Sequence, residues 1–246
     1  PVPRRRATPG PTIDRTFRAL ARSDAEAAGR LLLALLPLQG TAWRGAIAYD
    51  IVPDARGGPC LWVTAAAGST TIRVSPIPRP RDEVDLQLIG APGRIARLLI
   101  AGRWRRRSGL GVARVRGRRA GLAALAALLA LPLDLGELHR AGVRLDAETA
   151  LSLVAGMIDP RWTAGERFAL ALVTPGARPA HLVVRDGRPP RVIATAPSDG
   201  IATTVGCRAD RLAPALAGDS VHGLNVAGEE RPLRLLREWI VRAQSG

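Results

Sequence analysis

The order of apolar and polar positions is nearly the same in two parts of the chain. Alternation of apolar and polar residues predicts short strands, and apolar residues spaced three and four apart predict helices. In the first part this gives helices at 24–36, 92–101 and 120–131, and strands near 46–52, 60–66, 71–75, 84–89 and 110–115. Ser23 and Glu26 have the spacing of a capping box that opens the first of these helices.

The second part follows the same order. Its predicted elements are helices at 146–158, 208–217 and 231–243, and strands near 167–173, 181–185, 191–195, 201–206 and 223–227. Strands that cluster in sequence, with helices before and after them, are typical of α+β domains. We therefore predict two repeated domains, each a five-stranded, mainly antiparallel sheet with helices packed on one face.

Direct alignment of the two parts supports a duplication. Without a gap, residues 84–102 align with 200–218 at a constant offset, which places Gly90 on Gly206 and Gly102 on Gly218. Upstream, DAEAAGRLLLALL at 24–36 aligns with DAETALSLVAGMI at 146–158. A repeat of this length indicates two copies of one domain, because solenoid units are only about 20 to 50 residues long. The predicted boundaries are a flexible basic arm at 1–13, a first repeat at 14–142 and a second at 143–246.

Composition and charge restrict the partners. Hydrophobic residues make up 47% of the chain and aromatic residues only 3%, so Leu, Val, Ala and Ile must form most of the core. Lysine is absent, so all 36 basic residues are arginine, and with 21 acidic residues the net charge is +15. Residues 1–140 contain 23 arginines and 10 acidic residues. A basic first part favours anionic partners such as nucleic acid, lipid headgroups or an acidic protein.

Cysteine content and hydropathy suggest a location. Cys60 and Cys207 are too few for a disulfide framework, and no secretory signal is recognisable at the start. The longest apolar run, AGLAALAALLALPL at 120–133, is shorter than the roughly 20 residues that cross a bilayer. The sequence therefore predicts a cytoplasmic protein with a buried helix at this run.

Motifs of catalysis and cofactor binding are missing from the sequence. It contains no GxSxG, no GxxxxGK[ST] and no lysine for a Schiff base. His139, His181 and His222 are isolated, without the ligand spacing of a zinc site. We therefore expect no enzyme activity, no metal and no cofactor.

The repeated unit is similar to a known family. Copy one contains VDLQLIG, RIARLLIAG, GLGVARVRG and GLAALAALLAL in order, and copy two contains GIATTVG, DRLAPALAG, GLNVAG and PLRLLREWI. This order resembles the sterol carrier protein family of non-specific lipid-transfer domains. The resemblance implies a tandem duplication in which helices and sheet enclose an apolar tunnel for a sterol, fatty acid or acyl-CoA.

Two sets of candidate site residues follow. The ligand-binding set consists of the apolar positions on the short and closing helices of each copy, which are Leu98, Leu99, Leu122, Leu125, Leu128, Leu129, Leu212, Leu216, Leu233, Leu236, Trp239 and Ile240. The alternative interpretation of these apolar positions is ordinary core packing. The second set is a basic patch for anionic surfaces, and it contains Arg103, Trp104, Arg105, Arg106, Arg107, Arg114, Arg116, Arg118 and Arg119.

The function predicted from the sequence is therefore non-catalytic binding or carriage of a hydrophobic small molecule, with the basic loop contacting an anionic membrane surface. Two alternatives remain open. The Arg103–Arg119 patch is also compatible with a nucleic-acid or regulatory binding module. A scaffold or accessory subunit with filled cavities would keep the same fold without a ligand.

Overall fold

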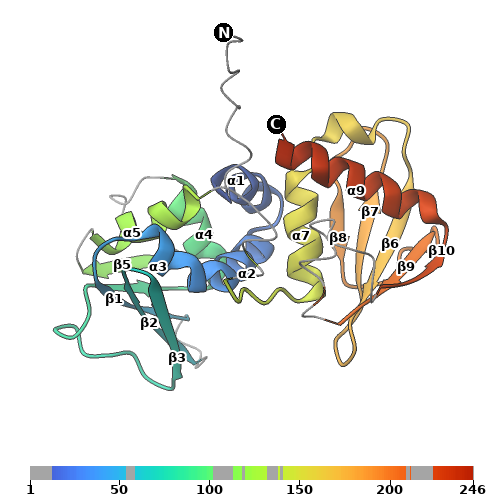
Figure 1. The fold of residues 1–246 in the computed structure, drawn as a ribbon. Helices are drawn as coiled ribbons and strands as arrows, with labels where there is room; N and C mark the ends of the chain where they lie inside the picture. The colour runs from blue at the N-terminus through green and yellow to red at the C-terminus, as the bar shows by residue number, and fades with distance from the viewer. Residues whose placement is uncertain are drawn as a thin grey trace, which may run out of the picture.

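The computed structural model describes residues 13–53, 59–101, 113–117, 120–131, 138, 141–208, 211 and 224–245. The chain forms two halves, each with its own sheet (Figure 1). The elements of the first half are α1 (Ile13–Ser23), α2 (Ala25–Leu35), η1 (Leu36–Leu38), α3 (Gln39–Ala42), β1 (Ile47–Val52), β2 (Cys60–Ala66), β3 (Ser69–Ser75), β4 (Leu86–Ile89), α4 (Pro92–Ala101), β5 (Arg114–Gly117) and α5 (Ala120–Leu129).

The second half has the same arrangement. Its described elements are α7 (Ala147–Met157), η2 (Pro160–Thr163), β6 (Phe168–Val173), β7 (Ala180–Val184), β8 (Arg191–Ile193), β9 (Thr203–Gly206), β10 (Asn225–Gly228) and α9 (Glu230–Ser245). Most of the helix predicted at 208–217 lies outside the described residues. Helix α1 was not predicted, although Ile13, Phe17 and Leu20 have helical spacing and are all buried.

The predicted fold class is confirmed. The first sheet has the order β3-β2-β1-β4-β5 and the second the order β10-β9-β6-β7-β8, which is the same order written from the opposite edge. Every neighbouring pair is antiparallel except the central ones, β1 with β4 and β6 with β9, which are parallel. Figure 1 shows α9 lying across one face of the second sheet.

Strand register gives the correspondence between the halves. Gly117 pairs with Leu86, and Leu86 pairs with Tyr49; in the second half Gly228 pairs with Thr203, which pairs with Leu170. Leu86 therefore corresponds to Thr203, and Tyr49 to Leu170. The two glycines have φ angles of 115° and 95°, and a side chain at either one would collide with backbone of the adjacent strand.

This register corrects the alignment made from sequence by one residue. The sequence alignment placed Gly90 on Gly206, whereas the structure places Gly90 on Cys207, because the amide of Gly90 donates to the Val52 carbonyl and that of Cys207 to the Val173 carbonyl. A shift of one residue moves every side chain of a strand to the opposite face of the sheet. The sequence alignment therefore compared residues on opposite faces in this strand.

The capping box predicted at Ser23 is also wrong. Asp24 is the N-cap of α2, and its carboxylate accepts a hydrogen bond of 2.9 Å from the Ala27 amide. Asp146 caps α7 in the same way, accepting from the Thr149 amide at 2.6 Å. Ser23 ends α1, where its hydroxyl donates to backbone carbonyls of that helix. The repeated Asp-Ala-Glu sequence thus starts the equivalent helix in each half.

The two halves share one apolar core. Its buried residues form a continuous cluster that includes Phe17 and Leu31 from the first half and Leu151 and Val154 from the second. Helix α1 packs against both α2 and α7, and Arg30 forms an ion pair of 2.6 Å with Glu148 across the boundary. None of the described helices is long and apolar enough to span a membrane.

A buried ion pair holds the connection between β3 and β4, residues 76–85, which we call the first crossover. The Arg79 guanidinium lies 2.7 Å from the Asp50 carboxylate, and the Arg79 amide donates to the same group at 2.6 Å. Asp50 lies on the sheet face opposite to Tyr49, so the first crossover covers the face that the helices leave open. Arg79 also donates to the Tyr49 and Val63 carbonyls and lies 5.5 Å from the centre of the Trp62 ring.

We expect Asp50→Ala to destabilise the protein by about 3–5 kcal/mol, because it leaves the Arg79 guanidinium buried without its partner. The side chain of Asp50 has no exposed surface, and that of Arg79 is 12% exposed. Urea unfolding followed by circular dichroism measures the change. Arg161→Ala is the control, since the Arg161 side chain is 88% exposed in its ion pair with Asp159 and its loss should leave the unfolding midpoint unchanged. Equal midpoints for the Asp50→Ala and control variants would contradict the role given to the buried pair.

Candidate functional site

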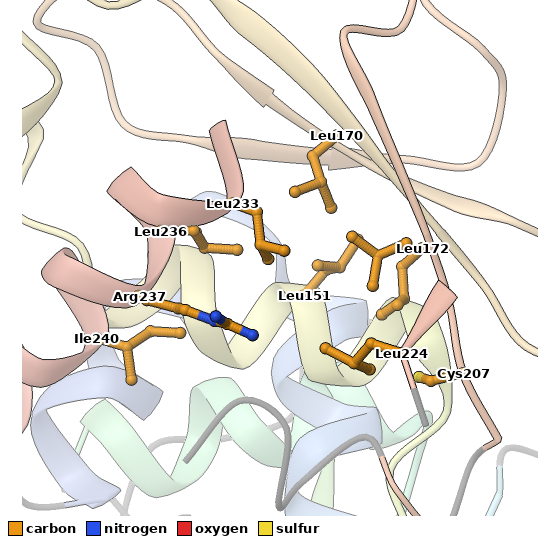
Figure 2. A pocket seen from close by; sticks show the side chains of 10 residues that line it. Leu151, Leu170, Leu172, Cys207, Leu224, Leu233, Leu236, Arg237 and Ile240 are labelled. Atoms are coloured by element: carbon orange, nitrogen blue, oxygen red, sulfur yellow. The ribbon is translucent and has the colours of Figure 1, made fainter. Parts of the chain in front are cut away.

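A pocket lies between the second sheet and its helices (Figure 2). Leu170 and Leu172 come from β6, Val205 from β9 and Leu151 from α7. The remaining lining residues are Cys207, Leu224, Leu233, Leu236, Arg237 and Ile240. Leu170, Leu172 and Val205 lie on the face of the sheet that the helices cover. The pocket therefore lies in the interior of the second half.

Arg237 differs from the other nine lining residues in chemistry. Its side chain points from α9 into the pocket, toward Leu151 and Leu224 (Figure 2). The Nε atom is buried and has no hydrogen-bond partner among the described residues. The residue as a whole is half-buried, and a buried N–H without a hydrogen-bond partner is unfavourable. The pocket therefore combines an apolar wall with one cation whose hydrogen-bonding capacity is incompletely used.

In the first half a tyrosine side chain fills the equivalent space between helices and sheet. Tyr49 stands where the second half has Leu170, and it is fully buried. Its hydroxyl donates a hydrogen bond of 2.6 Å to Oε1 of Gln39, which is also fully buried. Burial raises the pKa of Tyr49 far above its usual value, so the phenol stays protonated and remains a donor.

The second half alone has an arginine at the position of Arg237. Gly117 and Gly228 occupy the same position, so Ala126 of α5 corresponds to Arg237 of α9. Helix α2 has Gly29 where α7 has Leu151, and Gly29 packs directly against Pro92 and Gly93 at the start of α4. The two halves therefore share a backbone but differ in what fills the space between helices and sheet.

The structure places the predicted ligand-binding residues in two environments. Leu233, Leu236 and Ile240 line the pocket, while Trp239 stacks on Phe168 with 6.1 Å between ring centres. In the first half Leu99, Leu122, Leu125, Leu128 and Leu129 are buried in the core, and Leu98 is half-buried against it. Leu212 and Leu216 lie outside the described residues.

Little of the predicted basic patch can be placed. Arg114 and Arg116 lie on the edge strand β5 and are exposed. Arg103, Trp104, Arg105, Arg106, Arg107, Arg118 and Arg119 lie outside the described residues. In the part of the chain that the structure describes, no group of three or more His, Cys, Asp or Glu residues is placed to hold a metal ion.

Sequence reasoning missed seven pocket residues, six of them outside the closing helix and one, Arg237, on it. These are Leu151, Leu170, Leu172, Val205, Cys207, Leu224 and Arg237. Comparison of the repeats could have identified two of them, since Leu170 aligns with Tyr49 and Arg237 with Ala126 once the strand register is known. At the first position the polar residue, Tyr49, is in the first copy, and at the second position the polar residue, Arg237, is in the second copy.

No protein-family model matches the chain, and no curated protein matches it. Similar solved structures include the stereoselective inverting sec-alkylsulfatase Pisa1 from Pseudomonas sp., at 19% identity and a TM-score of 0.34. They also include a double mutant of the same sec-alkyl sulfatase, at 18% identity and a TM-score of 0.35. Each match covers 48% of this chain and about a fifth of the solved chain, 19% and 20% respectively.

These neighbours are enzymes, and this finding contradicts two predictions made from the sequence. One is that the protein is not an enzyme. The other is its function as a non-catalytic carrier, given with a nucleic-acid module or an accessory subunit as alternatives. At this identity and TM-score the likeness assigns no reaction to the present chain. The resemblance to the sterol carrier protein family stays a prediction.

The cavity itself also differs from the predicted tunnel. Its volume of about 30 Å³ is close to that of a single water molecule. A sterol or a long acyl chain does not fit in this space without displacement of the surrounding side chains. The described residues of the second half therefore enclose a small cavity, and they do not form the open apolar tunnel expected from the resemblance.

We expect Tyr49→Phe to lower the free energy of unfolding by about 1–3 kcal/mol, because it leaves buried Oε1 of Gln39 without its donor. Gln39→Leu alone should also destabilise, since it leaves the tyrosine hydroxyl unpaired. The double variant Gln39→Leu with Tyr49→Phe removes both polar groups and should recover most of the loss. Denaturant unfolding of all four proteins measures the coupling, and strictly additive losses would show that this hydrogen bond does not stabilise the first half.

Proposed function

We propose that the second half binds a small amphiphile, with a short alkyl segment in the pocket and an anionic group on Arg237. This site suits a bound ligand and a reacting substrate alike. The observation that carries the proposal is the buried Nε of Arg237, which lacks a hydrogen-bond partner among the described residues and faces an apolar cavity. A carboxylate can accept two parallel hydrogen bonds from a guanidinium, which supplies the missing partner.

The comparison of the halves supports this assignment. In the first half the Tyr49 hydroxyl donates to Oε1 of Gln39, while Nε2 of Gln39 has no hydrogen-bond partner among the described residues. The second half has Leu170 at the position of Tyr49 and Arg237 at the position of Ala126. Of the six buried side-chain atoms without a hydrogen-bond partner among the described residues, only Arg237 Nε belongs to a residue that lines this pocket.

The small cavity volume determines how the ligand enters. An alkyl segment needs more room than about 30 Å³, so side chains on α9 must move as it binds. The helix is attached to its surroundings near both ends, by Arg231 to Glu166 at 2.7 Å and by Arg242 over the Trp162 ring at 4.6 Å. Leu233, Leu236 and Arg237 lie between these attachments. The cytoplasmic location predicted from the sequence stays part of this proposal.

We expect Arg237→Met to weaken octanoate binding by about tenfold or more, because a charge-assisted hydrogen bond is lost while the volume of the side chain is largely kept. Binding of 1-octanol should be unchanged, and octylammonium should bind the wild-type protein more weakly than octanoate does. Isothermal titration calorimetry measures the three affinities. Arg234→Met is the matched control, since Arg234 lies on the same helix and is exposed. An octanoate affinity that is equal in the Arg237→Met and Arg234→Met variants would refute the proposal.

We expect Leu170→Phe to abolish binding of both octanoate and 1-octanol, because the ring extends into the cavity from β6. Overpacking of this kind costs about 1–3 kcal/mol, which a thermal melt of the variant would detect. The two variants thus separate the apolar part of the site from its charge. Unchanged binding in a folded Leu170→Phe variant would place the alkyl segment elsewhere.

A further inference from the structure

The second sheet has another cavity, on the side away from the Arg237 pocket. The connection between β8 and β9, residues 194–202, is the second crossover. A groove of about 360 Å³ lies between this crossover and the ends of β6 and β7. Ala169 and Val183, which pair across these strands, line this groove together with Ile201 of the crossover.

Two arginines line the same groove. Arg167 and Arg185 lie just beyond Phe168 and Val184, the last pair of the β6–β7 ladder, and both side chains are exposed. Like charges on neighbouring strands repel each other. This repulsion is unfavourable unless an anion lies between the two side chains.

The protein neutralises this pair only weakly. Asp199 is 3.7 Å from Arg185, and the two side chains are 60% and 51% exposed. An ion pair with this geometry and exposure contributes little to stability. None of the described residues forms an ion pair with Arg167. A ligand can therefore replace Asp199 at Arg185 at small cost.

The first half does not contain this feature. The register of β1 with β2 places two alanines, Ala46 and Ala66, at the positions of Arg167 and Arg185. In that half Arg79 ties the crossover to the sheet through Asp50, whereas the second half has Ala171 at the position of Asp50. The fold thus forms without opposed arginines, and with a crossover bound directly to the sheet.

We propose that this groove is a second ligand site, which takes a small monocarboxylate with a compact apolar body. The carboxylate bridges Arg167 and Arg185, and the apolar body lies on Ala169, Val183 and Ile201. Asp199 and Glu229 also line the groove, so its four charged side chains sum to zero. A single negative charge is therefore favoured over a phosphate dianion. The site is independent of the Arg237 pocket.

Benzoate is the probe, and NMR titration of the full chain carrying Arg237→Met avoids binding at the other pocket. We expect benzoate to shift the amide signals of Ala169 and Val183, and benzamide and phenyl phosphate to bind more weakly. Arg167→Gln and Arg185→Gln should each weaken benzoate binding by about tenfold. Both side chains are exposed, so neither variant should affect folding.

Arg178→Gln is the matched control, because Arg178 is exposed in the turn between β6 and β7, at the opposite end of these strands. Benzoate affinity should be unchanged in this variant. The proposal is overturned if Arg167→Gln and Arg185→Gln bind benzoate as the control does, or if benzamide binds as tightly as benzoate. Stronger binding of phenyl phosphate would refute the monocarboxylate assignment.

Discussion

The parallel pairing at the centre of each sheet determines how the chain connects its strands and which segments cover each face of the sheet. β1 with β4 and β6 with β9 run in the same direction, so the chain must cross the sheet between them instead of turning back in a hairpin. The first crossover covers the face opposite to the helices, where Arg79 reaches Asp50. Each half therefore has one space between helices and sheet and another between crossover and sheet, and both proposed sites arise from this division.

The two copies use these spaces differently. In the first half Tyr49 and Gln39 occupy the helix side, and Arg79 with Asp50 and Trp62 occupies the crossover side. Arg79 and Asp50 are paired within the protein, whereas Nε2 of Gln39 has no hydrogen-bond partner among the described residues. In the second half Leu170 and Ala171 replace Tyr49 and Asp50, and each space has a cavity on its side of β6. Neighbouring substitutions on a single strand, β6, thus change both faces of the sheet, because adjacent strand residues point to opposite sides.

Much of the fold could be predicted from sequence, because its signals are local. The Asp-Ala-Glu starts of α2 and α7, and the alternation along β1 and β6, need only a few adjacent residues. The alignment of Gly90 with Gly206 was one residue off, because two glycines matched by identity although Gly206 is the last paired residue of β9 and Gly90 lies one residue beyond the last paired residue of β4. Strand register depends on hydrogen bonds between distant segments, which an ungapped sequence comparison does not detect.

Less of the candidate sites could be predicted, for a related reason. The apolar stripe of α9 is visible in sequence at Leu233, Leu236 and Ile240, but Arg237 between them resembles a residue of the solvent face. Its burial depends on Leu151 and Leu224, which belong to other elements. Arg167 and Arg185 are separated by a whole hairpin, so only the pairing of β6 with β7 brings them together.

Buried polar atoms without a hydrogen-bond partner occur in both halves of the described chain. They are Arg30 Nε, Gln39 Nε2 and Trp43 Nε1 in the first half, and Ser152 Oγ, His181 Nδ1 and Arg237 Nε in the second. The second half differs because Arg237 lines a cavity, and because Arg167 and Arg185 line a groove on the other face of its sheet. The halves share one continuous core, so the buried ion pair of Arg79 with Asp50 in the first half stabilises the second as well. Groups that are poorly paired in the free protein are the ones that gain most from a ligand, since the bound anion supplies the missing partner. On the proposed function, the first half pairs its crossover arginine, Arg79, within the protein, while the second half leaves Arg237 and Arg167 available for a ligand.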